Sequence, residues 1–323
     1  MRDLAIHPRD NDLVIATHGR GIWIIDDITP LRALTPATIT RHAAFFQTAP
    51  AVQQIGAFGG WANGDAEFIG QNPPGDAVIT YYLQKRHIFG DMKLEVHDSS
   101  GKLLATLPTS KRRGLSRATW SMRMPPARIP PAASVAFGVG PRYLPGTYTV
   151  KLVEGDSTYT TPLRITRDAR IKHSLADRQA QFDLSVRLYG ILNEMTGVVE
   201  KMNGVRGALE NRAVTLTASD SLALKLRGAS GTVDDMRKKI VATKEGGMIT
   251  GEERLRENLA SLYGSVVGYE GRPSATQVER TAAIERELGE LSKQFDLWVA
   301  RELGPLNTML VARHLQRIEL VVP

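Results

Sequence analysis

The spacing of apolar and polar residues divides the chain into stretches with different periods. Residues 1–35 and 76–167 hold short apolar runs bounded by Gly, Pro, Asn and Asp, which predicts β-strands joined by turns. From residue 168 to 323, apolar residues recur every three or four positions, which predicts helices. Residues 36–75 follow neither period. We therefore expect a multidomain β plus α protein.

The first 27 residues predict three short strands around a glycine-rich turn. Residues 4–6, 13–16 and 22–25 are apolar, and His-Gly-Arg-Gly at 18–21 joins the last two runs. We expect Gly19 and Gly21 to supply the positive φ that such a turn needs. Three strands cannot close a core of their own. We therefore expect residues 1–27 to lie against a protein partner or a missing part of the same fold.

Several segments resemble one protein family. Residues 2–8 (Arg-Asp-Leu-Ala-Ile-His-Pro), residues 16–23 (Ala-Thr-His-Gly-Arg-Gly-Ile-Trp) and Asp26-Asp27 look like the closing blade of bacterial β-propeller proteins with sortilin-type or BNR-like repeats. Members of this family are often labelled glycosyl hydrolases. Further segments similar in type and order to its C-terminal region are residues 72–75, 77–83, 114–120, 145–150 and 179–183.

The resemblance implies that residues 1–35 are the remnant of a last propeller blade. It also implies a secreted or periplasmic full-length protein, of which this chain is a fragment. No hydrophobic signal core follows Met1, so a native start there would instead indicate the cytoplasm. The Asp-box of the family, Ser-x-Asp-x-Gly-x-Thr-Trp, does not occur in the 323 residues. Any glycosidase active site is therefore expected in the missing N-terminal part.

Residues 36–75 are expected to be a connector. Pro and Gly interrupt them repeatedly, yet they carry Phe45, Phe46, Phe58, Trp61 and Phe68. Rings of this size favour a strap packed on a neighbouring domain, and sugar stacking is the alternative.

Residues 76–167 predict a β-sandwich of immunoglobulin or fibronectin type. The expected strands are 77–83, 92–97, 103–107, 115–122, 147–153 and 159–165. Period-two spacing directs Trp120 and the set Tyr148, Val150 and Leu152 toward the core.

Residues 168–323 predict an antiparallel helical bundle. Its first helix is expected to start at Ser174, with Asp177 at the capping-box position. A second helix opens at 217–220 and is expected to break around 228–231. Residues 250–253 and 274–277 predict capping boxes for a third and a fourth helix. Gly304-Pro305 is expected to end the fourth helix before a last helix at 306–318.

Composition narrows the chemistry. The chain has no cysteine, which removes disulfides, thiol catalysis and Cys-ligated metals. Its seven histidines show no metal-ligand spacing, so we expect no metal site and no cofactor. No apolar run reaches about 18 residues, so we expect no transmembrane segment. The net charge is +7, and residues 76–167 carry 14 basic against 6 acidic residues.

Two groups of residues are candidate sites. His18 and Arg20 lie in the glycine-rich turn, where they either face a ligand or fix the turn by bonding backbone carbonyls. Lys111, Arg112, Arg113 and Arg117 form a basic cluster that is either an anion-binding patch or ordinary solvated surface. Arg123 and Arg128 extend it, and Trp120 lies within it. Because Trp120 is expected in the core, the expectation is against a nucleic-acid partner.

Carboxylates give no catalytic pair. Asp26 and Asp27 are adjacent and would point to opposite faces of a regular strand, so we expect them to end the strand and bond turn amides. We therefore expect a non-catalytic accessory or interaction region that braces a propeller or binds partners. The alternatives are the accessory end of a propeller glycoside hydrolase and a basic module that binds anions or polysaccharide.

Overall fold

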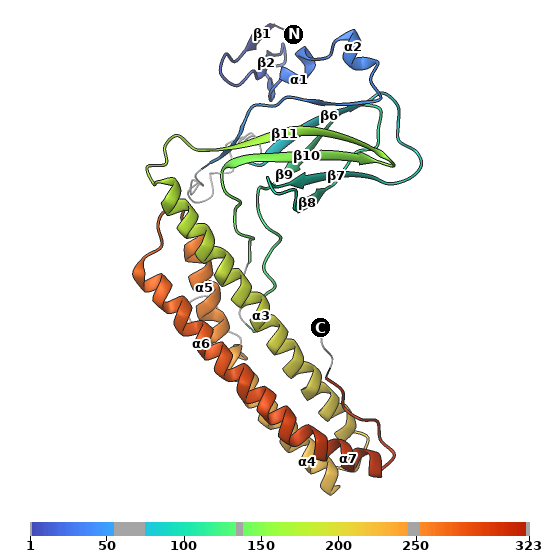
Figure 1. The fold of residues 1–323 in the computed structure, drawn as a ribbon, viewed down its shortest axis with the longest axis vertical. Coiled ribbons are helices and arrows are strands. Elements are labelled where there is room, and N and C mark those ends of the chain that lie inside the picture. The colour runs from blue at the N-terminus through green and yellow to red at the C-terminus, as the bar shows by residue number, and fades with distance from the viewer. Residues whose placement is uncertain (1, 55–74, 134–137, 245–251, 321–323) are drawn as a thin grey trace. The chain divides into compact units, whose positions relative to one another are not determined.

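The computed structural model describes residues 2–54, 75–133, 138–244 and 252–320, and it is a mixed α/β protein (Figure 1). The chain divides into two compact units. The first unit, the β unit, comprises Met1–Met124 and Tyr143–Lys172. The second, the helical unit, comprises Pro125–Arg142 and His173–Pro323.

The β unit begins with a small antiparallel sheet, called the N-terminal sheet below. Its strands β1 (Asp3–Ile6), β2 (Leu13–Ala16) and β3 (Ile22–Ile25) lie in the order β1-β2-β3. The three strands expected from the sequence are thereby confirmed. Two one-turn helices follow, α1 (Thr29–Arg32) and α2 (Pro36–Ile39), each with a proline in its first turn.

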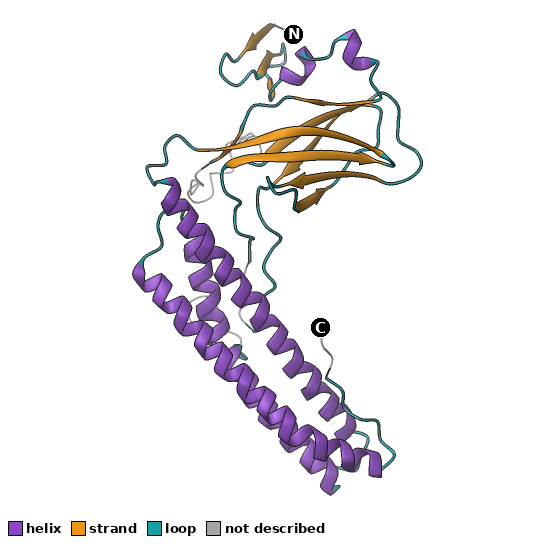
Figure 2. Cartoon of the chain, viewed as in Figure 1, coloured by secondary structure: helices purple, strands orange, loops and turns teal. Residues whose placement is uncertain are grey.

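Two larger sheets make up the rest of the β unit (Figure 2). One has the order β5-β11-β10-β7-β8 and the other the order β4-β6-β9. The strands are β4 (Ala43–Phe46), β5 (Ala51–Gln53), β6 (Ala77–Leu83), β7 (Met92–His97), β8 (Leu103–Leu107), β9 (Gly114–Trp120), β10 (Gly146–Glu154) and β11 (Ser157–Arg167). The six strands expected between residues 76 and 167 are confirmed, with ends displaced by a few residues.

One hydrophobic core joins the two larger sheets. Ile79 of β6 and Trp120 of β9 belong to the same buried cluster as Val150 and Leu152 of β10, which have no exposed surface. Tyr148 is also buried, so the predicted inward set on β10 is confirmed. Alternate residues of each strand point to one face, and that face is covered by the other sheet.

The segment expected to be a connector contributes to both of these sheets. Strand β4 pairs antiparallel with β6, and β5 pairs parallel with β11. Phe46 of β4 is 5% exposed, so the expected packing of this ring holds, but β4 is a strand of a larger sheet and not a strap laid on it. The sequence did not indicate these two strands, because Pro and Gly repeatedly interrupt residues 36–75. Phe58, Trp61 and Phe68 lie outside the described residues.

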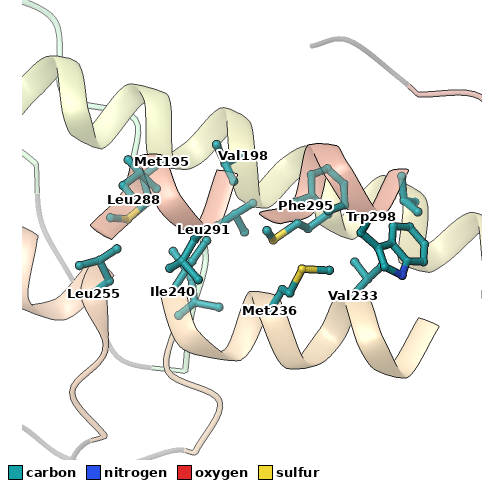
Figure 3. Close-up of a cluster of buried hydrophobic side chains, with 14 of the residues drawn as sticks. Met195, Val198, Val233, Met236, Ile240, Leu255, Leu288, Leu291, Phe295 and Trp298 are labelled. Atoms are coloured by element: carbon teal, nitrogen blue, oxygen red, sulfur yellow. The ribbon is translucent and has the colours of Figure 1, made fainter. Parts of the chain in front are cut away.

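The helical unit is built from five α-helices among its described residues. They are α3 (Leu175–Ala213), α4 (Ser221–Ile240), α5 (Leu255–Val267), α6 (Ala275–Trp298) and α7 (Gly304–Ala312), with a π-helical turn at Val299–Leu303 between the last two. Figure 3 shows side chains of α3, α4, α5 and α6 directed at one another, among them Met195, Met236, Leu255 and Phe295. Capping boxes begin α3 at Ser174 and α6 at Ser274, as predicted.

Three helix predictions were wrong. Helix α4 runs unbroken through residues 228–231, because buried Leu226 and Val233 on either side outweigh the roughly 1 kcal/mol cost of each glycine. Helix α5 begins after Arg254, with Glu257 completing its capping box, instead of at 250–253. The predicted last helix was wrong at both ends: Gly304-Pro305 does not break the helix, because the π turn runs directly into α7 with Pro305 in its first turn, and α7 ends at Ala312 instead of 318.

The proline-rich loop after β9 belongs to the helical unit, although the sequence placed it within the β domain. Arg128 donates its backbone N–H to Asn193 at 2.9 Å, and its carbonyl accepts from the Thr196 hydroxyl at 2.9 Å. Ala127 joins the helical core. The loop therefore covers one side of α3.

Candidate functional site

The turn between β2 and β3 is closed by a threonine and a glycine. Thr17 donates its backbone N–H and its hydroxyl to the carbonyl of Gly21, at 3.0 and 2.9 Å. The predicted source of positive φ was wrong, because Arg20, at +67°, holds the left-handed conformation and neither Gly19 nor Gly21 does. Gly21 instead allows the backbone to lie close to the Thr17 side chain, because a Cβ at this position would lie 3.2 Å from the Thr17 hydroxyl oxygen.

The two candidate residues of this turn are both exposed. His18 accepts a hydrogen bond at its Nδ1 from Arg2 Nε at 3.2 Å, which links the turn to the start of β1. Over the described residues, no hydrogen bond or ion pair orients the Arg20 guanidinium of the same turn. Neither residue lines a described cavity, so their role as a ligand face stays a prediction.

The N-terminal sheet exposes apolar side chains on both of its faces. On β3 the exposed fractions are 73% for Ile22, 67% for Trp23, 59% for Ile24 and 42% for Ile25. Successive strand residues point to opposite faces, so both faces carry large exposed apolar groups. No residue of β1, β2 or β3 is buried. Exposure of this kind marks an interaction surface.

The edges of the N-terminal sheet are equally open. Strand β2 pairs with β1 on one side and with β3 on the other. Within the part of the chain that the structure describes, the outer edges of β1 and β3 pair with no further strand. Unpaired backbone N–H and C=O groups along an edge can accept another strand.

Asp26 and Asp27 follow β3 and end the sheet. Asp27 adopts a φ of +43° and accepts a hydrogen bond from the backbone N–H of Thr29 at 3.0 Å. Its own N–H donates to the Asp12 carboxylate at 2.9 Å. The expected structural role in the turn is confirmed for Asp27.

The basic cluster is divided by the structure. Arg117 donates from one guanidinium nitrogen to the carbonyl oxygens of Asp26 and Asp27, at 2.9 and 2.6 Å. That nitrogen binds backbone instead of an external anion. Lys111, Arg112 and Arg113 lie exposed in the loop between β8 and β9. Arg123 lies beyond β9, and Arg128 forms an ion pair with Glu200 in the helical unit.

A second loop, which sequence reasoning missed, lies against residues 111–113. The β6–β7 loop, residues 84–91, includes exposed Lys85, Arg86, Ile88 and Phe89. His87 donates its backbone N–H to the carbonyl of Lys111 at 3.0 Å, and the Lys111 ammonium donates to the carbonyl of Gly90 at 3.0 Å. The run Lys-Arg-His-Ile-Phe at 85–89 could have indicated this loop, because it places two cations beside two apolar residues. It lies between two predicted strands and was treated as an ordinary connection.

Below this loop, Glu154 lies between two histidines. His87 Nδ1 is 2.6 Å from Glu154 Oε1, and His42 Nε2 is 2.9 Å from Glu154 Oε2. The other ring nitrogen of His87 faces the carbonyl of Gly90 at 3.2 Å. Both nitrogens of His87 therefore face oxygen atoms. These contacts fix the β6–β7 loop to the end of β10.

Tyr81 fixes the neighbouring loop from inside the core. Its hydroxyl donates to the carbonyl of Ser110 at 2.8 Å and accepts from the Ser110 N–H at 2.7 Å. Burial raises the pKa of Tyr81, and the Ser110 hydrogen bond opposes that effect in part. The hydroxyl therefore stays protonated at neutral pH and can make both bonds.

A cavity of about 400 Å³ opens beside β4 and β11. Its floor is apolar, with Ile79, Val150 and Leu163, and its rim is polar, with Thr161 and Arg164. The cavity has room for a small molecule. Its described lining offers one charged side chain, so it has no acid–base pair for catalysis.

Among the described residues, no group of three or more His, Asp or Glu side chains lies close enough to hold a metal ion. The helices over the same ranges include none with both the length and the apolar character needed to cross a bilayer. No family model matches this chain, and neither a curated protein nor a solved structure matches it.

Proposed function

We propose that this chain is a non-catalytic interaction region whose N-terminal sheet docks between further β-sheets, as one blade of a sortilin-type or BNR-like propeller. A single observation carries the proposal. Ile22, Trp23, Ile24 and Ile25 are consecutive, apolar and 42–73% exposed. A strand with this sequence is buried on both faces when its partners are in place.

The blade geometry accounts for both faces. Propeller blades are four-stranded sheets that stand side by side around a central channel, so each blade is covered by a neighbour on either face. The N-terminal sheet has three strands and two open edges, which leaves a place for a fourth strand. The resemblance of residues 2–8 and 16–23 to a closing blade supports the same assignment.

The remaining parts would then act as a brace. The two larger sheets share one core, and their arrangement supports an immunoglobulin-like sandwich next to the blade. Arg117 of β9 ties that sandwich to the end of the N-terminal sheet through the carbonyls of Asp26 and Asp27. An exported compartment is part of this proposal, because the family it draws on is secreted.

Photo-cross-linking tests the proposal. A benzoylphenylalanine placed at Trp23, in the protein expressed in its source cells, should form cross-links that mass spectrometry can map. The expected products are peptides with short apolar strands and Gly-rich turns similar to residues 2–28. The same probe at Leu224 of α4, which is 58% exposed, serves as the matched control and should not yield those peptides.

Two results would overturn the proposal. Cross-links from Trp23 to residues 2–28 of a second copy would indicate a dimer in place of a blade. Cross-links to helical peptides only, or none at all, would mean that no β-sheet covers β3.

A further inference from the structure

Two loops at one end of the β unit form a single surface, called the loop pair below. It consists of the β6–β7 loop, residues 84–91, and the β8–β9 loop, residues 108–113. Each loop leads from one of the larger sheets to the other. The loops are joined by the bonds from His87 N–H to the Lys111 carbonyl and from the Lys111 ammonium to the Gly90 carbonyl.

The loop pair is held in place from below. Tyr81 binds the backbone of Ser110 through two hydrogen bonds, and the Glu154 carboxylate binds the His87 ring. Both anchoring side chains sit on strands, β6 and β10. The tip of the loop pair is therefore presented by a fixed base.

The tip carries two adjacent apolar residues that no other described part of the chain covers. Ile88 is 67% exposed and Phe89 is 85% exposed, the highest value among the exposed large apolar residues that the structure describes. Isolated exposed apolar residues are ordinary. Two bulky neighbours at the end of a protruding loop are instead suited to insertion into another phase or surface.

Five cations surround this tip. Lys85 and Arg86 precede it, and Lys111, Arg112 and Arg113 lie on the second loop, all exposed. Over the described residues, none of the five forms an ion pair with a carboxylate. The nearby acids have other partners: Asp91 lies 4.0 Å from Lys93, and Glu154 faces His42 and His87. The region around Ile88 and Phe89 therefore has an excess of positive charge, in which the Lys111 ammonium also donates to the Gly90 carbonyl.

We propose that the loop pair docks on the surface of an anionic lipid bilayer. Ile88 and Phe89 would enter the boundary between headgroups and acyl chains, and the five cations would contact lipid phosphates. A bilayer fits better than a folded partner, because the apolar tip is only two residues wide and cations border it on both loops. The proposal uses residues other than those of the N-terminal sheet, so it stands independently of the propeller assignment.

Vesicle flotation tests this directly. The full chain should float with vesicles of phosphatidylcholine and phosphatidylglycerol and remain in solution with vesicles of phosphatidylcholine alone. Added salt should weaken the binding, since screening shortens the reach of the cations. The double variant Arg112→Gln, Arg113→Gln should bind about 30-fold more weakly, as each surface cation contributes roughly a factor of five.

The apolar tip has its own variant. Ile88→Ala, Phe89→Ala should weaken binding to the same vesicles at least about tenfold, because buried apolar area is lost while the charge is unchanged. Two control variants match these changes on the helical unit. Leu224→Ala removes an exposed apolar side chain, and Lys239→Gln with Arg286→Gln removes two exposed cations. Neither control should change vesicle binding.

A label at the tip reports directly whether the tip enters the bilayer. The chain has no cysteine, so Phe89→Cys carries a polarity-sensitive fluorophore at one position. Its emission should shift to the blue with anionic vesicles, while a label at Leu224→Cys should not shift.

Three results would overturn the membrane proposal. The first is no binding to anionic vesicles at all. The second is binding that the tip variant leaves unchanged. The third is binding to heparin or polyglutamate that depends on Arg112 and Arg113 but not on Phe89, which would indicate a polyanion or an acidic protein as the partner.

Discussion

Strands β3 and β10 both carry large apolar residues, but their surroundings are opposite. In β10, Val150 and Leu152 are fully buried, because the β4-β6-β9 sheet covers their face. In β3, every residue from Ile22 to Ile25 is exposed. The difference shows that an apolar strand sequence does not by itself provide a cover, and we propose that another β-sheet covers β3.

The largest expected loss of stability comes from a substitution in the covered strand, β10. Leu152→Ala should lower the free energy of unfolding of the β unit by about 2–5 kcal/mol, because it leaves a cavity in a closed core. Ile24→Ala in β3 should change it by less than about 0.5 kcal/mol. Urea unfolding followed by tryptophan fluorescence compares the two variants, and equal losses would contradict the contrast between the strands.

The N-terminus of α3 contrasts with β3, because its hydrogen-bond partners lie within the described chain. In the capping box of α3, Asp177 donates its backbone N–H to the Ser174 hydroxyl oxygen at 3.0 Å. Ser174→Ala should destabilise the helical unit by about 1 kcal/mol. Thermal unfolding monitored at the helical circular dichroism band measures the loss. Ser174→Asp retains a capping acceptor and should restore most of the stability.

Uncovered apolar residues should also cause association. Trp23→Asp is expected to reduce self-association of the isolated chain severalfold while leaving its unfolding midpoint unchanged, because it places a charge on an open sheet face. Sedimentation velocity at several concentrations follows the change. If Trp23→Asp lowered the unfolding midpoint as Leu152→Ala does, β3 would already be covered within the chain.

The smallest expected effect concerns acid pH in the helical unit. The backbone N–H of Thr243 and the guanidinium of Arg254 lower the pKa of Glu252 from 4.5 to about 2. Because the folded-state pKa lies below the unfolded one, this stabilisation is present above pH 4.5 and is lost as pH falls toward 2. The Thr243 amide resonance of the folded chain should titrate with a midpoint near pH 2.

Glu252→Gln should remove that acid dependence. Glu253→Gln, a change of the same kind at the exposed neighbouring residue, should preserve it. A Thr243 resonance that moved only above pH 4.5 in the unmodified chain would contradict the direction of the shift.

Much of the fold could be predicted because its signals are local. The six strands between 76 and 167 are apolar or alternating runs bounded by turn residues, and the capping boxes at Ser174 and Ser274 each lie within four residues. Strands β4 and β5 could not be predicted, since their few residues acquire a strand conformation only by pairing with β6 and β11. The positive φ at Arg20 likewise follows from the bonds between Thr17 and Gly21.

The sequence predicted only one of the two loops that form the loop pair. The sequence indicated Lys111, Arg112 and Arg113, yet it missed Ile88 and Phe89, which lie more than twenty positions earlier. The two loops meet because β6 and β9 are neighbours in one sheet and β7 and β8 in the other. That adjacency is a property of the fold, and no local pattern contains it. Arg117, by contrast, was expected in the patch and binds the carbonyls of Asp26 and Asp27.

The most direct test of the account is hydroxyl-radical footprinting of Trp23. The native protein from its source cells and the isolated 323-residue chain are oxidised side by side, with buried Trp120 as the internal reference. The account predicts that Trp23 is oxidised readily in the isolated chain and is protected in the native protein, while Trp120 is protected in both. Equal oxidation of Trp23 in the two samples would mean that nothing covers the N-terminal sheet, and the proposed docking would be wrong.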